Sequence, residues 1–383
     1  MKKVRLGDVC DVFAGQGAPQ GNEKYCNYDS GIPFIKAGDL GDLMSGKSER
    51  ELQCVDEAVA KECKLKLYQA GSVLFAKSGM SCMKGYVYCT KEPCYVVSHL
   101  AIITPKKVEK EYLKHYFQYY KPNTLVKDSA YPSISLSDIS NMEILLPSIE
   151  EQKEIAGRLD KVVALIEKRK EQLAKLDQLV KSRFIEMFGD VTVEQKNTIK
   201  LGSICKTMGG GTPTTKKSEY YEGNIPWIST VSLGPNYIDG SDAKGYITND
   251  AIINSATKLI PAYSVMVGTR VGVGKSSVNT VPICANQDIN SITGLDSQKY
   301  MPLFIKYVVD AYQSYFDSIK KGATILGINS NDLKNINVPK VSIGLQKEFV
   351  SFAEQVDKSK FDIQQSIDKL ETLKKSLMQQ YFG

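Results

Sequence analysis

The chain has 383 residues, of which 42% are hydrophobic and 24% are charged. This composition is typical of a soluble globular protein, and the length suffices for two domains that each bury their own core. No apolar run approaches the roughly 18 residues of a membrane helix, and the first residues lack the apolar stretch of a signal peptide. We therefore expect a cytoplasmic protein that has no contact with a membrane.

The net charge of +6 comes from 49 basic and 43 acidic residues. Segments 148–190 and 341–383 each contain equal numbers of basic and acidic residues, so the excess lies in the rest of the chain. A weak basic surplus permits binding to a polyanion such as nucleic acid but does not require it.

Nine cysteines and two histidines limit the possible metal and redox chemistry. The cysteine count is odd and no Cys-x-x-Cys pair occurs, which predicts reduced thiols rather than a disulfide framework. Two histidines, His99 and His115, are too few for a histidine-based zinc or iron site without help from other ligands. We expect no metal site.

The first 147 residues mix short β-rich runs with glycine, proline and asparagine turns. The expected strands include Tyr86–Cys89 and Tyr95–Val97, and the expected helix is Tyr112–Tyr120. This pattern predicts an α+β domain with a twisted, largely antiparallel sheet.

A heptad pattern then predicts one long helix within residues 148–190. Pro147 precedes the helix, and neither proline nor glycine interrupts residues 158–188. The apolar seam of this helix includes Leu159, Val162, Ile166, Leu173 and Leu176, and Arg169 and Arg183 interrupt the seam.

The remainder of the chain repeats this layout at an offset near 194 residues. Residues 191–340 predict a second α+β domain, with a strand at Ser264–Val267 and a helix at Leu303–Phe316. Residues 341–383 predict a second long helix, whose seam includes Val356, Ile363, Ile367, Leu370 and Leu377.

The two predicted helices have charged outer faces and bury their seams best against one another. If a pseudo-twofold axis relates the two copies, this pairing is antiparallel, and it holds the two domains a fixed distance apart. The alternative is that each helix packs on its own globular half as an ordinary amphipathic element.

Enzyme motifs are incomplete throughout the chain. The run Gly272-Val273-Gly274-Lys275-Ser276 is similar to the end of a phosphate-binding loop, but the position that requires the first glycine is Thr269. No Asn-Pro-Pro or Asp-Pro-Pro sequence of a DNA amino-methyltransferase occurs. Glu151-Gln152-Lys153 matches only the shortest form of a nuclease pattern and opens a charged helix. We predict no catalytic residue.

Loops that combine small residues with basic or polar side chains are the candidate nucleic-acid contacts, because phosphates need close backbone approach and base edges need reach. In the first copy the candidates are Gln16, Lys36, Lys77, Ser78, Lys84 and His99. In the second copy they are Thr212, Lys216, Lys217, Ser229, Arg270, Lys275, Asn286 and Gln287, of which the last two are rough counterparts of His99. For each, the alternative is an ordinary turn with a solvated side chain.

Aromatic residues lie between these loops. These aromatic side chains either stack on bases or fill the core, and we expect most of them to lie in the core. The residues concerned are Tyr86, Tyr88, Tyr131, Tyr220 and Tyr221.

The chain resembles the specificity (S) subunits of type I restriction-modification enzymes along essentially its whole length. The resemblance rests on motifs that occur twice in the same order: Leu-Gly-Asp/Ser, a small-residue loop, Ile-Pro-Phe/Trp-Ile, a second turn, and Gln-Lys-Glu opening a helix that ends in Phe-Gly. The first copy departs from the glycine-rich second turn, since it has Ser78-Gly79-Met80-Ser81 there.

The resemblance implies two target recognition domains, residues 1–147 and 191–340, that each read one half of a bipartite, asymmetric DNA site. It implies spacer helices at 148–190 and 341–383 that form an antiparallel coiled coil and set the gap between the half-sites. It also implies partners: double-stranded DNA, two methyltransferase (M) subunits and a restriction (R) subunit.

No cofactor is expected in this chain, because S-adenosylmethionine, ATP and Mg are expected in the partner subunits. A different possibility is a coiled-coil adaptor whose globular halves bind proteins and never contact DNA. The two possibilities differ in the salt dependence of binding, which is steep only when phosphate contacts release counterions.

Overall fold

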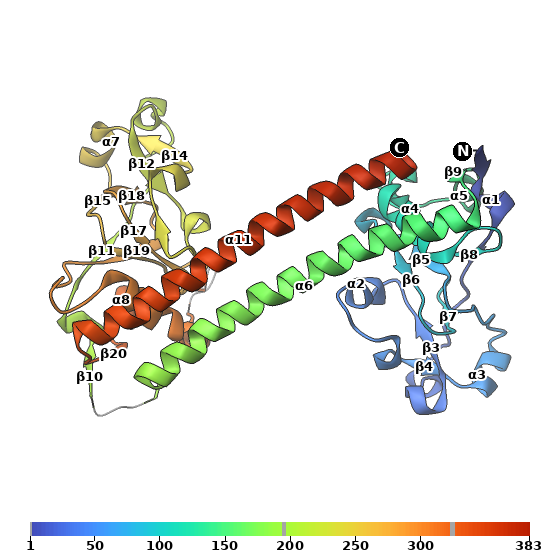
Figure 1. Cartoon of the computed structure of the whole chain (residues 1–383), viewed down its shortest axis with the longest axis horizontal. Helices are drawn as coiled ribbons and strands as arrows, with labels where there is room; N and C mark the ends of the chain where they lie inside the picture. Colours follow the sequence, from blue (N-terminus) through green and yellow to red (C-terminus); the bar gives the residue numbers. More distant parts are fainter. Residues whose placement is uncertain (1, 194–196, 322–325) are drawn as a thin grey trace. The chain divides into compact units, whose positions relative to one another are not determined.

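The computed structural model describes residues 2–193, 197–321 and 326–383. The chain divides into two compact units: unit 1 is Met1–Arg169 with Ser366–Gly383, and unit 2 is Lys170–Gln365. Each unit contains one α+β domain, the beginning of one long helix and the end of the other (Figure 1).

Unit 1 has a four-stranded sheet of order β2-β8-β5-β6, in which all neighbours are antiparallel. The same unit has a three-stranded sheet of order β4-β3-β7, in which β3 is parallel to β7. A short pair, β1 with β9, precedes the first long helix. The strands are β1 (Lys2–Arg5), β2 (Cys10–Ala14), β3 (Ile32–Ile35), β4 (Cys54–Val55), β5 (Val73–Ala76), β6 (Tyr88–Cys89), β7 (Tyr95–Val96), β8 (Leu100–Pro105) and β9 (Glu143–Leu146).

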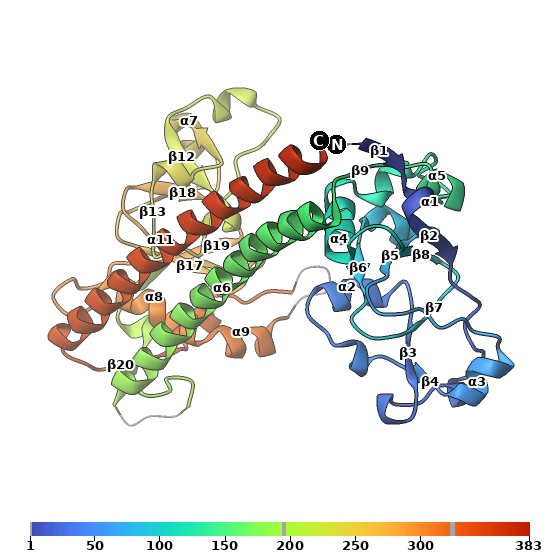
Figure 2. The same ribbon diagram turned by 45° about the vertical axis from the view of Figure 1, so that its right-hand side comes forward.

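Helix α4 covers the four-stranded sheet of unit 1 (Figure 2). The rings of Phe75 on β5 and Phe117 on α4 lie 5.2 Å apart between centroids, and both side chains are buried. The α-helices of this domain are α1 (Leu6–Val9), α2 (Asp39–Met44), α3 (Glu57–Glu62), α4 (Lys110–Tyr119) and α5 (Leu136–Ser140).

Unit 2 repeats this arrangement with more strands. A five-stranded sheet has the order β11-β19-β16-β17-β13, and a four-stranded sheet has the order β14-β12-β18-β15. Each contains one parallel pair, β13 with β17 and β12 with β18. The strands are β10 (Thr198–Lys200), β11 (Lys206–Gly209), β12 (Ile225–Ile228), β13 (Tyr237–Ile238), β14 (Gly245–Ile247), β15 (Leu259–Ile260), β16 (Val265–Gly268), β17 (Ser276–Asn279), β18 (Ile283–Ala285), β19 (Ile289–Thr293) and β20 (Asn337–Pro339).

The α-helices of the second domain are α7 (Asn249–Ile253), α8 (Pro302–Ala311), α9 (Gln313–Ile319) and α10 (Ser330–Lys334). The helix predicted at Leu303–Phe316 is therefore two helices, interrupted at Tyr312, whose hydroxyl donates to the carbonyl oxygen of Val191. The predicted α+β class with mixed and antiparallel sheets is confirmed. The predicted domain limits of 1–147 and 191–340 stay predictions.

The long helices are α6 (Ile149–Phe188) and α11 (Ile343–Phe382). A glutamine in the first turn of each helix is buried and ties the helix to the domain before it. Gln152 Oε1 accepts from the backbone amide of Glu109 at 2.8 Å, and Gln346 Oε1 accepts from that of Met301 at 2.9 Å. The glutamine of the repeated Gln-Lys-Glu sequence thus connects each long helix by a hydrogen bond to the start of α4 or α8.

The two helices run antiparallel, as two ion pairs between them within unit 2 show. In unit 1 Arg158 on α6 donates to the Tyr381 hydroxyl on α11 at 3.2 Å. In unit 2 Asp177 pairs with Lys360 at 2.7 Å and Arg183 pairs with Glu348 at 3.1 Å. Partner numbers on α11 fall as numbers on α6 rise, so the antiparallel pairing is confirmed.

The predicted seam positions are buried or half-buried along both helices. Buried positions are Leu159, Val162, Ile166, Val356 and Ile367, and half-buried positions are Leu173, Leu176, Ile363, Leu370 and Leu377. Toward the C-terminal ends the buried positions move one residue along, because a 3.6-residue turn drifts from a 3.5-residue repeat. The residues buried there are Phe184, Phe188, Met378 and Phe382.

These displaced residues pack on the globular domains. Phe382 at the end of α11 lies 5.1 Å from Tyr112 in unit 1, and Phe188 at the end of α6 lies 5.0 Å from Phe304 in unit 2, both between ring centroids. Each domain therefore contacts the beginning of its own helix and the end of the helix from the other copy. The alternative in which each helix packs only on its own globular half is wrong.

Candidate nucleic-acid interface

Three chain segments meet at one edge of the four-stranded sheet of unit 1. Strand β2 ends at Ala14, β5 ends at Ala76 and β8 begins at Leu100. Their register pairs Ala14 with Ala101 and Ala76 with Leu100, so the three strand ends are aligned. We call the segments that leave this edge, residues 15–16, 77–79 and 97–99, the loop edge of unit 1.

Unit 2 has the same arrangement. Strand β11 ends at Gly209, β16 ends at Gly268 and β19 begins at Ile289. Gly209 pairs with Asn290 and Gly268 pairs with Ile289. The loop edge of unit 2 is residues 210–212, 269–271 and 286–288.

Backbone hydrogen bonds match the two loop edges residue by residue. The Lys77 amide donates to the His99 carbonyl oxygen at 2.9 Å, and the Thr269 amide donates to that of Asp288 at 2.7 Å. The carbonyl oxygens of the same two residues each accept a further backbone hydrogen bond at 2.8 Å. The Ile134 amide donates to Lys77 in unit 1, and the Ile328 amide donates to Thr269 in unit 2.

Position 78 therefore corresponds to position 270, and position 99 corresponds to position 288. Asn286 and Gln287, which the sequence suggested as rough counterparts of His99, lie one or two residues before the matched position. The side chains at matched positions differ in chemistry, since Ser78 in unit 1 corresponds to Arg270 in unit 2, and His99 corresponds to Asp288.

Glycine opens both loop edges because the backbone of another loop passes close by. A Cβ atom on Gly15 would lie 2.1 Å from the Val97 carbonyl oxygen, and one on Gly210 would lie 2.1 Å from that of Asn286. The small residues that the sequence analysis assigned to phosphate approach are thus needed at these two positions for contact inside the protein.

In unit 1 the structure gathers Lys36, Lys77, Ser78 and His99 around the loop edge. Ser78 Oγ lies 2.9 Å from His99 Nδ1, and the imidazole is exposed. Lys36 follows β3, whose last carbonyl oxygen accepts from the Val97 amide, and its Nζ donates to Gln53 Oε1 at 2.7 Å. Lys84 lies apart, at the end of a 3-10 turn (Met80–Lys84) that Asn123 holds through the Met83 carbonyl oxygen.

In unit 2 the structure gathers Thr212, Ser229, Arg270, Asn286 and Gln287. The Thr212 hydroxyl donates to Gln287 Oε1. The backbone amide of Asn286, which follows β18, donates at 2.9 Å to the carbonyl oxygen of Ile228, the last residue of β12. Arg270 is exposed and has no ion-pair partner among the residues that the structure describes. Lys275 is exposed, and its carbonyl oxygen accepts from the Gly268 amide, which places it beside the same edge.

Other candidates have side chains with structural partners. Gln16 donates from Nε2 to the Lys64 carbonyl oxygen at 2.6 Å and accepts from the Lys66 amide. Asn286 is 9% exposed and donates from Nδ2 to Asp288 Oδ2 at 3.2 Å. Lys216 and Lys217 lie farther along the loop, where Lys217 Nζ donates to the Tyr220 hydroxyl at 3.2 Å. The assignment of each candidate as a DNA contact stays a prediction.

The aromatic residues between the loops divide in the same way. Tyr88 and Tyr220 are buried, Tyr86 and Tyr221 are half-buried, and Tyr131 is 82% exposed. The segment of Tyr131 lies at the loop edge of unit 1, because the Gly79 amide donates to the Pro132 carbonyl oxygen at 3.0 Å. Its ring is available for stacking on a base.

A cavity of about 440 Å³ opens beside Arg270 in unit 2. Its described lining combines two cations, Arg270 and Lys321, with the polar residues Asn329 and Asp332. Lys321 and Asp288 were not among the residues predicted from the sequence, because only the fold brings them to the same edge as Arg270.

The chemistry of the buried thiols agrees with a structural role. Burial raises the pKa of Cys89, Cys205 and Cys284 to about 11. Such thiols stay protonated and are poor nucleophiles near neutral pH. Among the described residues no group of His, Cys, Asp and Glu side chains is placed to hold a metal ion, and no helix is long and apolar enough to cross a membrane.

Comparison with known proteins adds an independent observation. Residues 1–178 and 193–374 both match the family model described as the type I restriction modification DNA specificity domain. A type I restriction enzyme specificity subunit of Escherichia coli is 31% identical over 288 residues, which cover 68% of this chain and 67% of the relative. A second such subunit, from Methanocaldococcus jannaschii, is 32% identical over 150 residues, covering 37% of this chain and 33% of the relative.

Two solved structures have the same fold. One is a type I restriction-modification S subunit from M. genitalium, with a TM-score of 0.57 and 13% identity, covering all of this chain and 96% of its own. The other belongs to a study of complex assembly in a type I R-M system, with a TM-score of 0.61 and 18% identity, covering 99% and 97%.

Proposed function

Because the chain belongs to the type I restriction modification DNA specificity family, we propose that its two loop edges read the two halves of one bipartite DNA site. Each loop edge presents exposed polar or basic side chains at the end of a sheet. Side chains of these types make the contacts of proteins with phosphates and base edges. The side chains at matched positions differ, so the two half-sites differ and the site is asymmetric.

The observation that supports this function best is the duplicated backbone with unlike side chains. The same hydrogen bonds hold both loop edges, whereas serine and histidine in unit 1 are replaced by arginine and aspartate in unit 2. A scaffold of this kind holds two different readers in one common frame. In this proposal the paired helices α6 and α11 set the spacing of the half-sites.

The partners are, in this proposal, two methyltransferase subunits and a restriction subunit, which contain the S-adenosylmethionine, ATP and Mg. The repeat itself suggests two copies of one partner, since equivalent surfaces bind equivalent molecules. Leu179 on α6 and Leu373 on α11 are equivalent exposed apolar residues, 47% and 45% exposed, and we assign one to each methyltransferase subunit. Since the proposed substrate is chromosomal or foreign DNA, we place the protein in the cytoplasm.

Replacement of one domain tests the modular reading. A host that expresses this chain with its methyltransferase is expected to show a split methylation motif with an unspecified spacer. Exchange of residues 191–340 for the corresponding segment of another family member should change one half of that motif and leave the other half intact. A change in both halves, or in neither, would contradict the proposal.

Salt dependence tests DNA binding separately. The complex of this chain with its methyltransferase is expected to lose DNA affinity steeply as salt rises, with a linear relation between log K and log salt. A protein adaptor would bind its partners with little response to salt and would show no affinity for duplex DNA.

A further inference from the structure

The matched positions at the two loop edges allow a sharper statement, which rests on the proposed function. We infer that positions 270 and 288 in unit 2, and positions 78 and 99 in unit 1, are the paired specificity-determining positions of the two domains. In unit 2 the pair is an arginine and an aspartate, and the base pair that it reads is G·C.

The geometry places the two members of each pair together. The backbone of Thr269 is hydrogen-bonded to Asp288 at 2.7 Å, and Arg270 is the next residue. In unit 1 the side chains at the matched positions touch, since Ser78 Oγ lies 2.9 Å from His99 Nδ1. The two positions of each pair therefore lie next to one another at the loop edge.

No described residue forms an ion pair with the side chain of Arg270. It is exposed, and the ion pairs of the described residues include none between Arg270 and Asp288. An ion pair occupies the N–H donors of a guanidinium, whereas no ion pair with a described residue occupies those of Arg270. The bidentate partner that an arginine finds in the major groove is the O6 and N7 of guanine.

Asp288 is held so that it can serve as the acceptor. Asn286 accepts from the Asp288 amide through Oδ1 and donates from Nδ2 to Asp288 Oδ2, each at 3.2 Å. These two bonds fix the carboxylate at the turn before β19. A carboxylate accepts from the N4 amino group of cytosine, which is the partner of guanine in the same base pair.

The pair in unit 1 has different donors and acceptors. Ser78 occupies one imidazole nitrogen of His99, which leaves one ring nitrogen and no fork for a base. Unit 1 therefore lacks the arginine-based guanine reading at this position. An ordinary solvated turn is the competing explanation for all four side chains, and a transplant of the pair separates the two explanations.

The test exchanges the pairs within one chain. The variant R270S/D288H gives unit 2 the side chains of unit 1, and S78R/H99D gives unit 1 those of unit 2. Each is expressed with the methyltransferase, and the methylated motif is mapped genome-wide. We expect R270S/D288H to lose one G·C requirement in the half-site of unit 2 alone, and S78R/H99D to gain one in the half-site of unit 1 alone.

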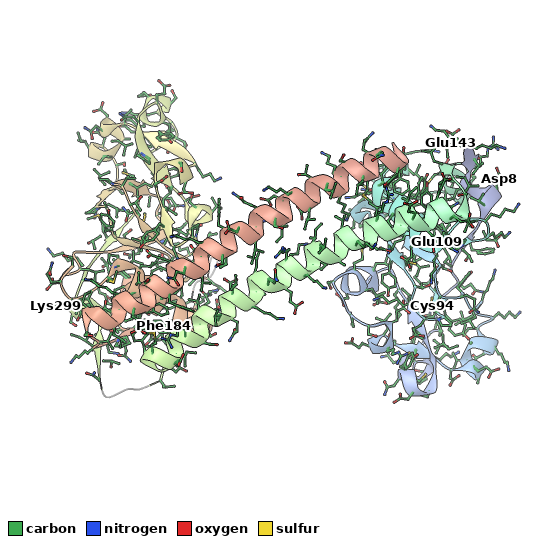
Figure 3. The ribbon with its side chains drawn as sticks, viewed as in Figure 1. Asp8, Cys94, Glu109, Glu143, Phe184 and Lys299 are labelled. Carbon is green, nitrogen blue, oxygen red and sulfur yellow. The ribbon has the colours of Figure 1, made fainter. Side chains whose placement is uncertain are left out.

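A matched control removes one cation from unit 2 at another place. Lys299 is exposed on the segment before α8, and its side chain pairs only with Asp296 at 3.2 Å among the described residues (Figure 3). The variant K299S should keep the wild-type motif. Thermal unfolding of all three variants checks that each domain is folded.

If a variant abolishes methylation, binding of the purified complex to a set of duplexes provides the second readout. The duplexes have each of the four base pairs at each half-site position. Loss of the arginine–aspartate pair should reduce the preference for G·C at one position by about 5- to 150-fold. An unchanged preference in a folded variant would overturn the inference.

The outcomes also separate this inference from the proposed function. A wild-type complex without a split motif and without affinity for duplex DNA would defeat the proposed function. A wild-type complex with a split motif, whose folded variants keep every base requirement, would defeat only the assignment of positions 78, 99, 270 and 288.

Discussion

His115 is a buried titratable side chain that links α4 of unit 1 to α6. It is 1% exposed, its Nε2 lies 2.9 Å from Asp160 Oδ1, and Lys114 Nζ lies 3.1 Å from the same oxygen. Burial, and next the charge of Lys114, lower the pKa of His115, and the opposing effect of Asp160 is smaller. The imidazole is therefore neutral in the folded protein near pH 7.

This lowered pKa gives the stability of unit 1 a pH dependence. Below about pH 6.5 the unfolded chain binds a proton at His115 that the folded chain does not, so the free energy of unfolding falls as pH falls through that range. We expect H115Q to flatten the dependence in urea unfolding measured by circular dichroism at pH 7.5, 6.5 and 5.5. Parallel curves for H115Q and wild type would refute the assignment.

Tyr263 occupies a backbone conformation that suits glycine. Its φ is +60°, and the matched residue in unit 1 is Gly71, with φ +88°. The two are matched because each amide donates at 2.7 Å, from Tyr263 to Asn279 and from Gly71 to Thr90. A left-handed conformation costs a residue with a Cβ about 1–2 kcal/mol, of which the greater freedom of an unfolded glycine cancels a part.

We therefore expect Y263G to raise the free energy of unfolding of unit 2 by about 0.5–1 kcal/mol. The side chain is 64% exposed, so little packing is lost. Y263A keeps the Cβ and should give no such gain. Urea unfolding of the three proteins measures the difference, and equal midpoints for Y263G and Y263A would show that the backbone is not strained there.

At the scale of elements, the end of α6 is fixed by an aromatic cluster. Phe184 is 3% exposed, and its ring lies 5.0 Å from Phe188, 5.4 Å from Phe349 and 6.1 Å from Phe304 between centroids (Figure 3). The cluster joins α6, α11 and α8 within unit 2. The heptad rule alone does not select Phe184, because the seam position is Arg183.

Truncation of this ring should loosen all three helices. We expect F184A to reduce the free energy of unfolding of unit 2 by about 3–5 kcal/mol, which is the usual range for a buried phenylalanine. The next residue provides the control: Ile185 is 54% exposed, and I185A should change stability by less than about 0.5 kcal/mol. Differential scanning calorimetry measures both, and similar effects would mean that Phe184 is not buried.

Two of the charged residues that interrupt the apolar seam form ion pairs with the opposite helix. Lys360 with Asp177 and Arg183 with Glu348 are partly exposed, so each pair adds at most about 1 kcal/mol. Their greater effect is on register, since a slip of either helix would separate both pairs.

At the scale of the whole molecule, the repeat predicts the stoichiometry of the complex. A charge at Leu179 or Leu373 should remove one methyltransferase subunit, because each exposed leucine is assigned to one copy. L179K and L373K are each expected to form complexes with one methyltransferase subunit, and the double variant complexes with none. Native mass spectrometry of the assembled complexes measures these numbers.

Leu165 provides the matched control for these variants. It is also 47% exposed on α6, but its counterpart on α11 is Ser359, so it is not part of a repeated surface. L165K should keep two methyltransferase subunits. Loss of a subunit from L165K, or two subunits retained by the double variant, would contradict the assignment.

The duplication, the two long helices and the α+β class of each domain could be predicted without a structure, because they follow from periodicities that local geometry imposes. The 194-residue offset and the heptad seam are visible without a fold, and the seam residues Leu159 and Val356 are buried as expected. The choice of Lys77 and Ser78 at the loop edge of unit 1, and of Arg270 and Lys275 at that of unit 2, was also within reach, since these residues come after the recognisable strands β5 and β16.

The fold was needed to establish which residues correspond across the two domains and which domain each helix end contacts. Asp288 is the counterpart of His99 because the same hydrogen bond between strands holds both residues, although the spacing between them departs from the 194-residue offset of the repeat. Phe188 packs on Phe304 and Phe382 packs on Tyr112, partners that are distant in sequence, because an antiparallel pair brings the end of each helix to the beginning of the other. Such contacts depend on chain reversal over more than a hundred residues, and no local pattern records them.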